Sequence, residues 1–201
     1  MSTAQDPIAL GPELAGTLMG PDEFDSVTES TEGFVYELIH GVLVVTPPPL
    51  EGERGPNDEL GFLLRLYQFQ NPDTATLDDT LPEQLVRTRN NRRRADRVIW
   101  AGLKRQPNPR MDVPTMVVEF VSAGKRNRRR DFLEKRDEYL AIEVSEYWVI
   151  DRFRRQMTVY RSGQPEILVS ETEVYRSPLL PGFELSLAHI LAVADRWERQ
   201  S

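Results

Sequence analysis

A carboxylate stands inside an apolar segment near the middle of the chain. Glu119 lies in "VVEFV", between Val117, Val118, Phe120 and Val121. In a strand, residues 117, 119 and 121 share one face and 118 and 120 the other, so both faces are apolar. We therefore expect a central strand with Glu119 at least partly buried, and a buried carboxylate needs a cation beside it. Two interpretations remain open: a buried Glu–Arg pair, or a metal-binding or catalytic role.

Two further acidic residues are candidates for the same site. Asp96 begins the preceding predicted strand, "ADRVIWA". If that strand pairs antiparallel with the segment around Glu119, the two carboxylates converge at one end of the sheet, where they repel unless a divalent ion bridges them. Glu37, in "FVYELIHG", shares a strand face with Val35 and Ile39. The simpler interpretation of Asp96 is a solvated residue at the start of a strand. The simpler interpretation of Glu37 is an exposed glutamate on an edge strand.

Lys135 is a candidate cation for these carboxylates. It belongs to a predicted helix, where Asp131, Lys135 and Tyr139 follow at intervals of four residues. A lysine at the margin of a packed helix face can bury its stem and present its ammonium group at a sheet end. The alternative is an ordinary pair between Asp131 and Lys135. The two histidines, at 40 and 189, lack metal-ligand spacing, and no phosphate-binding glycine motif occurs.

The basic residues are concentrated in one part of the chain. The net charge is -7, but residues 87–136 hold 16 of the 25 Lys/Arg and 5 of the 32 Asp/Glu. This local balance of +11 indicates a basic face on an acidic body, although a solvated helix with loops would give the same count. Such a face makes nucleic acid a candidate partner. Zero cysteines exclude a disulfide framework and fit a reducing cytoplasm.

The elements that must position these residues form a mixed pattern of helices and strands. The chain of 201 residues suits one α/β domain, with a central group of strands flanked by helices. We expect a flexible leader at 1–20, a domain at 21–201, and no signal peptide or membrane span. The expected elements are a short helix at 20–30, a hairpin at 34–45 turning at His40-Gly41, a helix at 57–71 capped by Asn57, strands at 83–89 and 95–101 around a basic turn "NNRRR", a strand at 115–122, a helix at 127–142, strands at 146–152, 156–161 and 166–170, and a helix at 188–200.

The order of these motifs resembles a known group of nucleases. Asp96, Glu119 and Lys135 in their segments resemble the PD-(D/E)XK restriction-endonuclease-like superfamily, and more closely the bacterial Uma-type endonuclease family. The segments "YELIHGVLVV", "ADRVIW", the stretch from "VVEFVSAGK" to "EYWVIDR", and "LLPGFELSL" follow that family's order over about residues 22 to 190. The lysine usual two residues after the glutamate is Val121 here, and the resemblance places its role on Lys135.

The resemblance implies a restriction-endonuclease-like core and metal-dependent hydrolysis of DNA phosphodiesters. Asp96, Glu119 and Glu37, with the Phe120 backbone carbonyl, would hold Mg²⁺, with Mn²⁺ as an alternative ion. Lys135 would orient the attacking water or stabilise charge on the phosphate. The DNA backbone would lie on Arg92, Arg93, Arg94, Lys125, Arg126, Arg128, Arg129 and Arg130. Family analogy and the need to cut two strands imply a homodimer. A non-catalytic nucleic-acid-binding module with the same fold is the alternative function.

Overall fold

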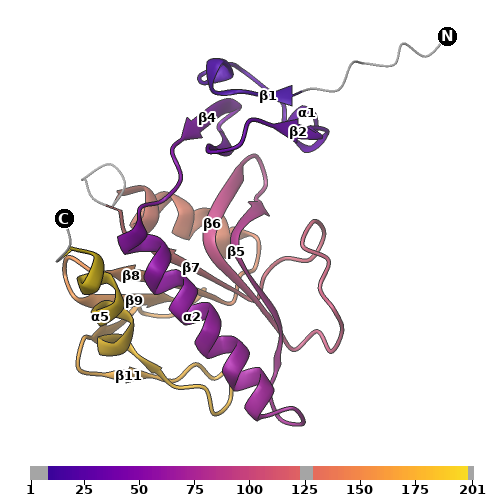
Figure 1. Cartoon of the computed structure of the whole chain (residues 1–201). Coiled ribbons are helices and arrows are strands. Elements are labelled where there is room, and N and C mark those ends of the chain that lie inside the picture. The colour runs from indigo at the N-terminus through magenta and orange to yellow at the C-terminus, as the bar shows by residue number, and fades with distance from the viewer. Residues whose placement is uncertain (1–8, 123–128, 199–201) are drawn as a thin grey trace.

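The chain folds around one large mixed sheet with helices on both faces (Figure 1). The computed structural model describes residues 9–122 and 129–198. Its main sheet has eight strands in the order β10-β9-β8-β7-β6-β3-β4, with β5 paired to β6. Strands β7 and β8 are parallel, and the other pairs of this sheet are antiparallel. The bounds are β3 Val35–Ile39, β4 Val42–Thr46, β5 Leu77–Arg87, β6 Arg92–Ala101, β7 Met116–Phe120, β8 Glu146–Asp151, β9 Gln156–Tyr160 and β10 Ile167–Ser170.

The remaining elements cover the sheet or extend it. Helices α2 and α5 pack together on one face, and α4 lies on the other (Figure 1). Within the described parts of the chain, no helix is long and apolar enough to cross a membrane. The bounds are α1 Pro21–Asp25, α2 Glu51–Gln70, a π-helical turn η2 Arg130–Glu134, α4 Lys135–Ala141, α5 Leu187–Glu198, a 3₁₀ turn η1 Pro12–Leu14, and two small strand pairs, β1 Ala9–Leu10 with β2 Glu29–Ser30 and β11 Val174–Tyr175 with β12 Leu185–Ser186.

The apolar runs explain why β7 and β8 are central. Every residue of both strands is buried, because each strand has neighbours on both edges and helices over both faces. Leu60 and Leu64 of α2 contribute to the core on one face, and Tyr139 of α4 to the core on the other. The predicted α/β fold with a central mixed sheet is therefore confirmed.

The sequence predicted the turn of the β3–β4 hairpin correctly, but not the start of helix α2. The turn at His40 and Gly41 is confirmed, with φ of 51° and 76°, respectively. The helix predicted from Asn57 begins at Glu51 instead, so the predicted cap is wrong. The Glu53 side chain accepts a hydrogen bond from the Leu50 N–H and closes the first turn. This start was missed because Pro56 lies inside the helix, where a proline ordinarily marks a boundary.

Residues 9–20 belong to the fold, which corrects the prediction of a flexible leader for that part. Leu10 and Met19 are buried in a small core with the β3–β4 hairpin. The Gly16 and Met19 N–H groups donate to the carbonyls of Leu43 and Gly41, at 2.8 and 2.9 Å. Residues 1–8 lie outside the described part of the chain. In Figure 1, β1, α1, β2 and the β4 end of the main sheet form the upper part of the molecule.

Candidate functional site

Asp96 and Glu119 converge from neighbouring strands, as the antiparallel arrangement predicted. Strands β6 and β7 pair in the register Arg97 opposite Val118, which brings Asp96 beside the end of β7. The Phe120 N–H donates to Asp96 Oδ2 over 2.5 Å. Glu119 is buried, with 2% of its surface exposed, and Asp96 is only partly buried. The sheet therefore supplies one buried and one accessible carboxylate at the same place.

Lys135 reaches this pair from the start of helix α4, which covers one face of the sheet. Its Nζ lies 2.7 Å from Glu119 Oε2 and 3.2 Å from the Arg94 carbonyl oxygen. Asp131 Oδ1 is 4.0 Å away, so the local pair between Asp131 and Lys135 also exists but is the longer one. Tyr139, one turn further along α4, donates its hydroxyl to Glu119 Oε1 over 3.2 Å. The buried ion pair expected for Glu119 is present, with lysine in place of arginine.

A π-helical turn precedes Lys135. The Lys135 N–H bonds to the Arg130 carbonyl, five residues back, and ordinary α-helix follows from Lys135 to Ala141. A single π turn inside a helix shifts the following side chains around the axis and often occurs at functional sites. The single helix predicted over 127–142 is thus interrupted just before the lysine.

The electrostatics of the group follow from burial. Burial raises the pKa of Asp96 to about 7, although Lys135 and the Phe120 N–H oppose the shift. Burial also raises the pKa of Glu119, against the opposing effect of Lys135. For Lys135, burial disfavours the ammonium, but the surrounding carboxylates outweigh it and raise the pKa. The lysine therefore stays protonated, and the excess of carboxylates over cations makes this a place where a further cation is stabilised.

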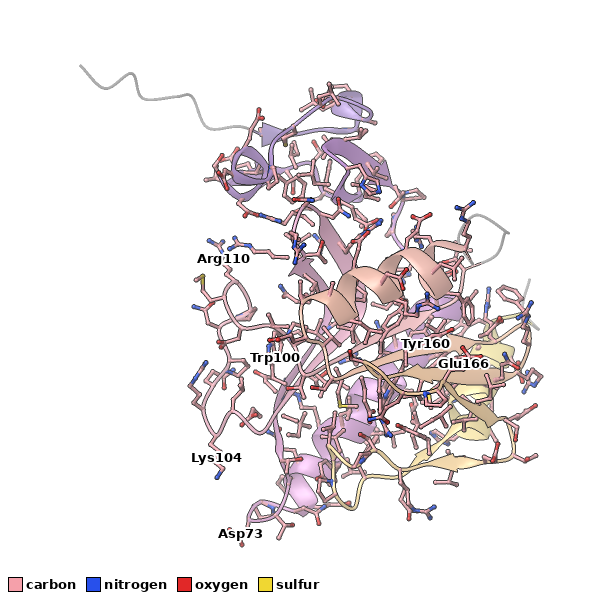
Figure 2. All side chains as sticks on the ribbon, turned by 180° about the vertical axis from the view of Figure 1, so that it is seen from behind. Asp73, Trp100, Lys104, Arg110, Tyr160 and Glu166 are labelled. Carbon is pink, nitrogen blue, oxygen red and sulfur yellow. The ribbon has the colours of Figure 1, made fainter. Side chains whose placement is uncertain are left out.

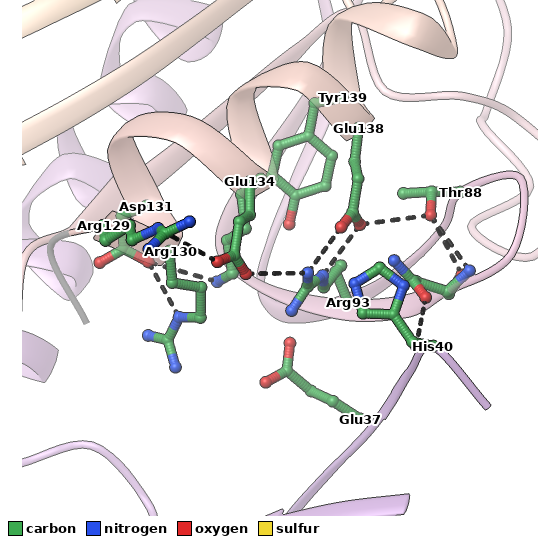
Figure 3. A network of polar contacts seen from close by, with 12 residues as sticks. Glu37, His40, Thr88, Arg93, Arg129, Arg130, Asp131, Glu134, Glu138 and Tyr139 are labelled. Carbon is green, nitrogen blue, oxygen red and sulfur yellow. Dashed lines mark hydrogen bonds and ion pairs between the residues drawn. The ribbon is translucent and has the colours of Figure 1, made fainter. Parts of the chain in front are cut away.

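Glu37 is buried, so the reading of an exposed edge-strand glutamate is wrong. Strand β3 lies between β4 and β6, and 5% of Glu37 is exposed. Its Oε1 accepts a hydrogen bond from the Arg94 N–H over 3.0 Å. In Figure 3 the carboxylate points from its strand toward Arg93 and the helix that carries Glu138. Glu37 thus joins the site from a third strand.

A cavity of about 440 Å³ opens beside these groups. Asp96, Glu37 and Lys135 line it. Glu119 does not line it but is hydrogen-bonded to Lys135. Further acidic and basic side chains from several elements also line the cavity: Glu53, Glu83, Arg94, Arg130 and Arg152. The cavity therefore combines carboxylates, which suit a hard cation, with guanidinium groups, which suit a phosphate.

The predicted DNA-binding arginines separate into distinct groups. The prediction that residues 92–94 form an exposed turn is wrong, because they begin β6 and the turn lies before them. Arg92 is bonded to both carboxylate oxygens of Asp25 at 2.8 Å. Arg93 is fully buried and donates two hydrogen bonds to Glu138, at 2.9 and 2.6 Å (Figure 3). Both are engaged inside the fold and are not available for phosphates.

For Arg94, Arg129 and Arg130, binding of the DNA backbone stays a prediction. Arg94 and Arg130 line the cavity, and the Arg129 side chain is 76% exposed. Arg130 also lies 3.1 Å from Asp131. Lys125, Arg126 and Arg128 lie outside the described residues.

The structure adds three residues that the sequence reasoning did not assign. Glu83 faces Asp96, since its neighbours pair with Arg97 and Ala95, and it has a φ of +49°. Arg152 follows the end of β8 and lines the cavity. Tyr139 could have been found from its spacing of four residues after Lys135, whereas Glu83 and Arg152 carry no local signal.

A metal at this site would have few protein ligands. Among residues 9–122 and 129–198, no three carboxylate or histidine groups stand close enough together to enclose an ion. Asp96 and Glu119, with the Phe120 carbonyl, are the nearest candidates. Mg²⁺ often uses only one or two carboxylates and keeps several waters, so this donor set fits it better than it fits an ion with many protein ligands.

Comparisons with known proteins gave structural matches and one family match. A search of curated proteins gave no match. A crystal structure of a putative nuclease belonging to DUF820, from Anabaena variabilis, superposes with a TM-score of 0.68 and 15% identity, over 88% of this chain and 99% of that one. The type IIG restriction endonuclease BpuSI gives a TM-score of 0.38 and 13% identity, over 76% of this chain and 17% of that one.

The first superposition shows that the fold is restriction-endonuclease-like, as the resemblance implied. The family comparison covers most of the chain: residues 21–188 match the Uma2 family, described as "Putative restriction endonuclease". The chain belongs to the Uma2 family of putative restriction endonucleases.

Proposed function

We propose that this protein is a metal-dependent endonuclease that hydrolyses DNA phosphodiester bonds at the site around Asp96 and Glu119. The family and the fold support a nuclease. The observation that carries the proposal is the meeting of two carboxylates from β6 and β7 with the Lys135 ammonium beside a cavity lined by arginines. These are the groups that phosphodiester hydrolysis requires: ligands for a hard cation, a fixed positive charge and a holder for phosphate.

The donor set supports Mg²⁺, or Mn²⁺ in its place. Asp96 and Glu119, with the Phe120 carbonyl, would hold the ion. The prediction that Glu37 is a third carboxylate ligand is wrong, because no three carboxylates of the described residues stand close enough together to enclose an ion. When bound, the ion would polarise the phosphodiester and make a bound water more acidic. The pKa values of Asp96 and Glu83 are raised chiefly by burial, with a neighbouring carboxylate adding to each shift, and a bound divalent cation would offset both effects.

Within the described residues, two of the three N–H donors of Lys135 are hydrogen-bonded, which leaves one for the substrate. An ammonium group carries three N–H donors, and those of Lys135 include bonds to Glu119 Oε2 and the Arg94 carbonyl. Since Lys135 lines the cavity, its third N–H can donate to a phosphate oxygen on which negative charge grows. Its raised pKa keeps it a donor, so it stabilises charge and does not act as the base.

Arginines around the cavity would bind the phosphate backbone. Arg94, Arg130 and Arg152 come from β6, η2 and the end of β8, so they surround the cavity from several elements. A guanidinium group pairs with phosphate through two parallel N–H bonds. Cutting both strands of a duplex needs two such sites, and we extend the proposal to a homodimer on that ground.

One observation favours the alternative, a nucleic-acid-binding module without catalysis. Both carboxylate oxygens of Glu119 are already hydrogen-bonded, one to Lys135 and one to Tyr139. A glutamate held in this way can be purely structural. The alternative predicts DNA binding at the arginines and no cleavage with any divalent ion.

Incubation of the purified protein with an end-labelled DNA duplex separates these functions. The reactions contain Mg²⁺, Mn²⁺ or EDTA, and a denaturing gel resolves the products. The nuclease proposal expects cleavage with Mg²⁺ or Mn²⁺ and none with EDTA. Intact DNA in all three reactions, together with a shift of the same duplex in a native gel, would support the alternative instead.

A further inference from the structure

A second cavity begins where the site cavity ends. It measures about 220 Å³ and is enclosed by the small N-terminal core, by β5 and by the loop between β6 and β7. Arg94 lines both this cavity and the site cavity. The two cavities therefore meet at the Arg94 side chain. A ligand chain that leaves the site can therefore continue into the second cavity, which we call the β5 cavity.

The charges of the β5 cavity leave a positive surplus. Asp25 is its one carboxylate among the described lining residues, facing Arg87, Arg94 and Arg110. Arg92 already holds both oxygens of Asp25, and Arg87 is 3.5 Å from one of them. These neighbours lower the pKa of Asp25, chiefly through the hydrogen bonds from Arg92, with Arg87 and Arg110 adding to the effect. One negative charge thus faces several guanidinium groups, which favours an anionic occupant.

The remaining walls suit an unpaired base. Leu10, Phe24, Val27, Tyr36 and Leu85 make much of the lining apolar, while the Gln84 side chain adds hydrogen-bonding groups. A base-paired duplex is too wide to enter a cavity of this size, whereas a single unstacked base is small enough to enter it. Proteins that hold single strands combine a basic track for the backbone with apolar surfaces for the bases.

We propose that the β5 cavity holds a single-stranded stretch of nucleic acid next to the phosphate being cut, with Arg87 and Arg110 on a neighbouring phosphate. The inference rests on the proposed function and narrows its substrate class to DNA with an unpaired segment beside duplex. At about 3.3 Å per strand residue, Arg87 lies roughly 13 Å along β5 from Glu83, beyond the reacting phosphate. Arg110 extends from the loop after β6 at one side of the molecule (Figure 2).

The test measures binding without cleavage, by fluorescence anisotropy in EDTA. The ligands are a blunt duplex and the same duplex with a single-stranded overhang. The wild-type protein is expected to bind the overhang duplex roughly tenfold more tightly, the scale for accommodating one base. Arg87→Gln with Arg110→Gln should abolish this preference, leave the blunt duplex unchanged, and reduce the salt slope for the overhang by about 0.7 per arginine.

Arg196→Gln is the matched control, because Arg196 is exposed on α5 and does not line the β5 cavity. It should keep the preference. Arg110→Gln alone provides a second variant on an exposed loop, should the double variant unfold. Equal binding of both ligands by wild type, equal weakening of both by the double variant, or no DNA binding would overturn the inference. Since cleavage is not measured, an overhang preference in a protein that never cuts would contradict only the proposed catalysis.

Discussion

Lys135 Nζ lies 2.7 Å from Glu119 Oε2, although the two residues are 16 positions apart and belong to a helix and a central strand. Both side chains are almost completely buried. The pair explains how a glutamate is tolerated between Val118 and Phe120, since the ammonium offsets the cost of removing the carboxylate from water. It also fixes the lysine where one of its donors reaches the cavity. The same contact thus serves stability and places a charge for chemistry.

Removing either partner should expose the coupling between them. Lys135→Met leaves a carboxylate buried without its cation and should cost about 3–5 kcal/mol of unfolding free energy at pH 8. Glu119→Gln should cost less, because Asp131 remains 4.0 Å from the ammonium. The variant with both changes should be more stable than Lys135→Met alone. Urea denaturation of the four proteins measures this, and additive losses would show that the pair is not coupled.

Asp96→Asn should change how stability depends on pH. In the folded protein the pKa of Asp96 is raised to about 7, well above its unfolded value. The folded state then keeps its proton between about pH 4 and 7 while the unfolded state loses it, so this group lowers stability as pH rises. Asparagine can still accept the Phe120 N–H bond. The variant should match wild type at pH 4 and exceed it by roughly 2–4 kcal/mol at pH 8. A constant difference across pH would contradict the raised pKa.

Arg92 and Arg94 should behave differently when replaced. Arg92→Met breaks two buried bonds to Asp25 and should cost about 2–3 kcal/mol in unfolding free energy. Arg94→Gln should cost little stability but weaken DNA binding across unrelated sequences, because its side chain lines the site cavity. Thermal melting and anisotropy measure the two effects. Wild-type stability of Arg92→Met would contradict the structural role of Arg92, and wild-type DNA binding by Arg94→Gln would contradict the binding role of Arg94.

Glu83→Gly should stabilise the protein. A φ of +49° costs a non-glycine residue about 1 kcal/mol, and the Glu83 carboxylate, whose pKa is raised mainly by burial, also faces Asp96. Glu83→Gln removes the charge and keeps the backbone strain, so it separates the two contributions. We expect the glycine variant to have the higher melting temperature of the two at pH 8. A lower melting temperature for glycine than for glutamine would show that the backbone there is not strained.

The sequence was most informative where a side chain conflicts with its surroundings. Glu119 among apolar residues and Asp96 at a strand predicted to pair antiparallel were sufficient to bring these two together, and Lys135 followed from helix spacing together with the family resemblance. The α/β class followed from alternating patterns. Each of these signals is local or depends on one pairing step.

The remaining features depend on contacts that no local pattern carries. Glu37 looks like an exposed strand residue until β6 is known to pair beside β3. The basic run at residues 92–94 looks solvated, but Asp25 and Glu138 come from distant segments to neutralise two of its members. Glu83 reaches the cavity because its backbone has a positive φ. Arg152 reaches it because it follows the end of β8. A count of charged residues along the chain does not show which of them form ion pairs in the folded protein.

Single-turnover cleavage by Asp96→Asn tests the central claim most directly. Its control is Asp73→Asn, since Asp73 is exposed in the turn after α2 and does not line the site cavity. With saturating enzyme, labelled DNA and Mg²⁺, the proposed site predicts that Asp96→Asn cleaves at least about 100-fold more slowly than wild type, while Asp73→Asn cleaves at the wild-type rate. Cleavage by Asp96→Asn at the wild-type rate would show that the phosphodiester is hydrolysed elsewhere.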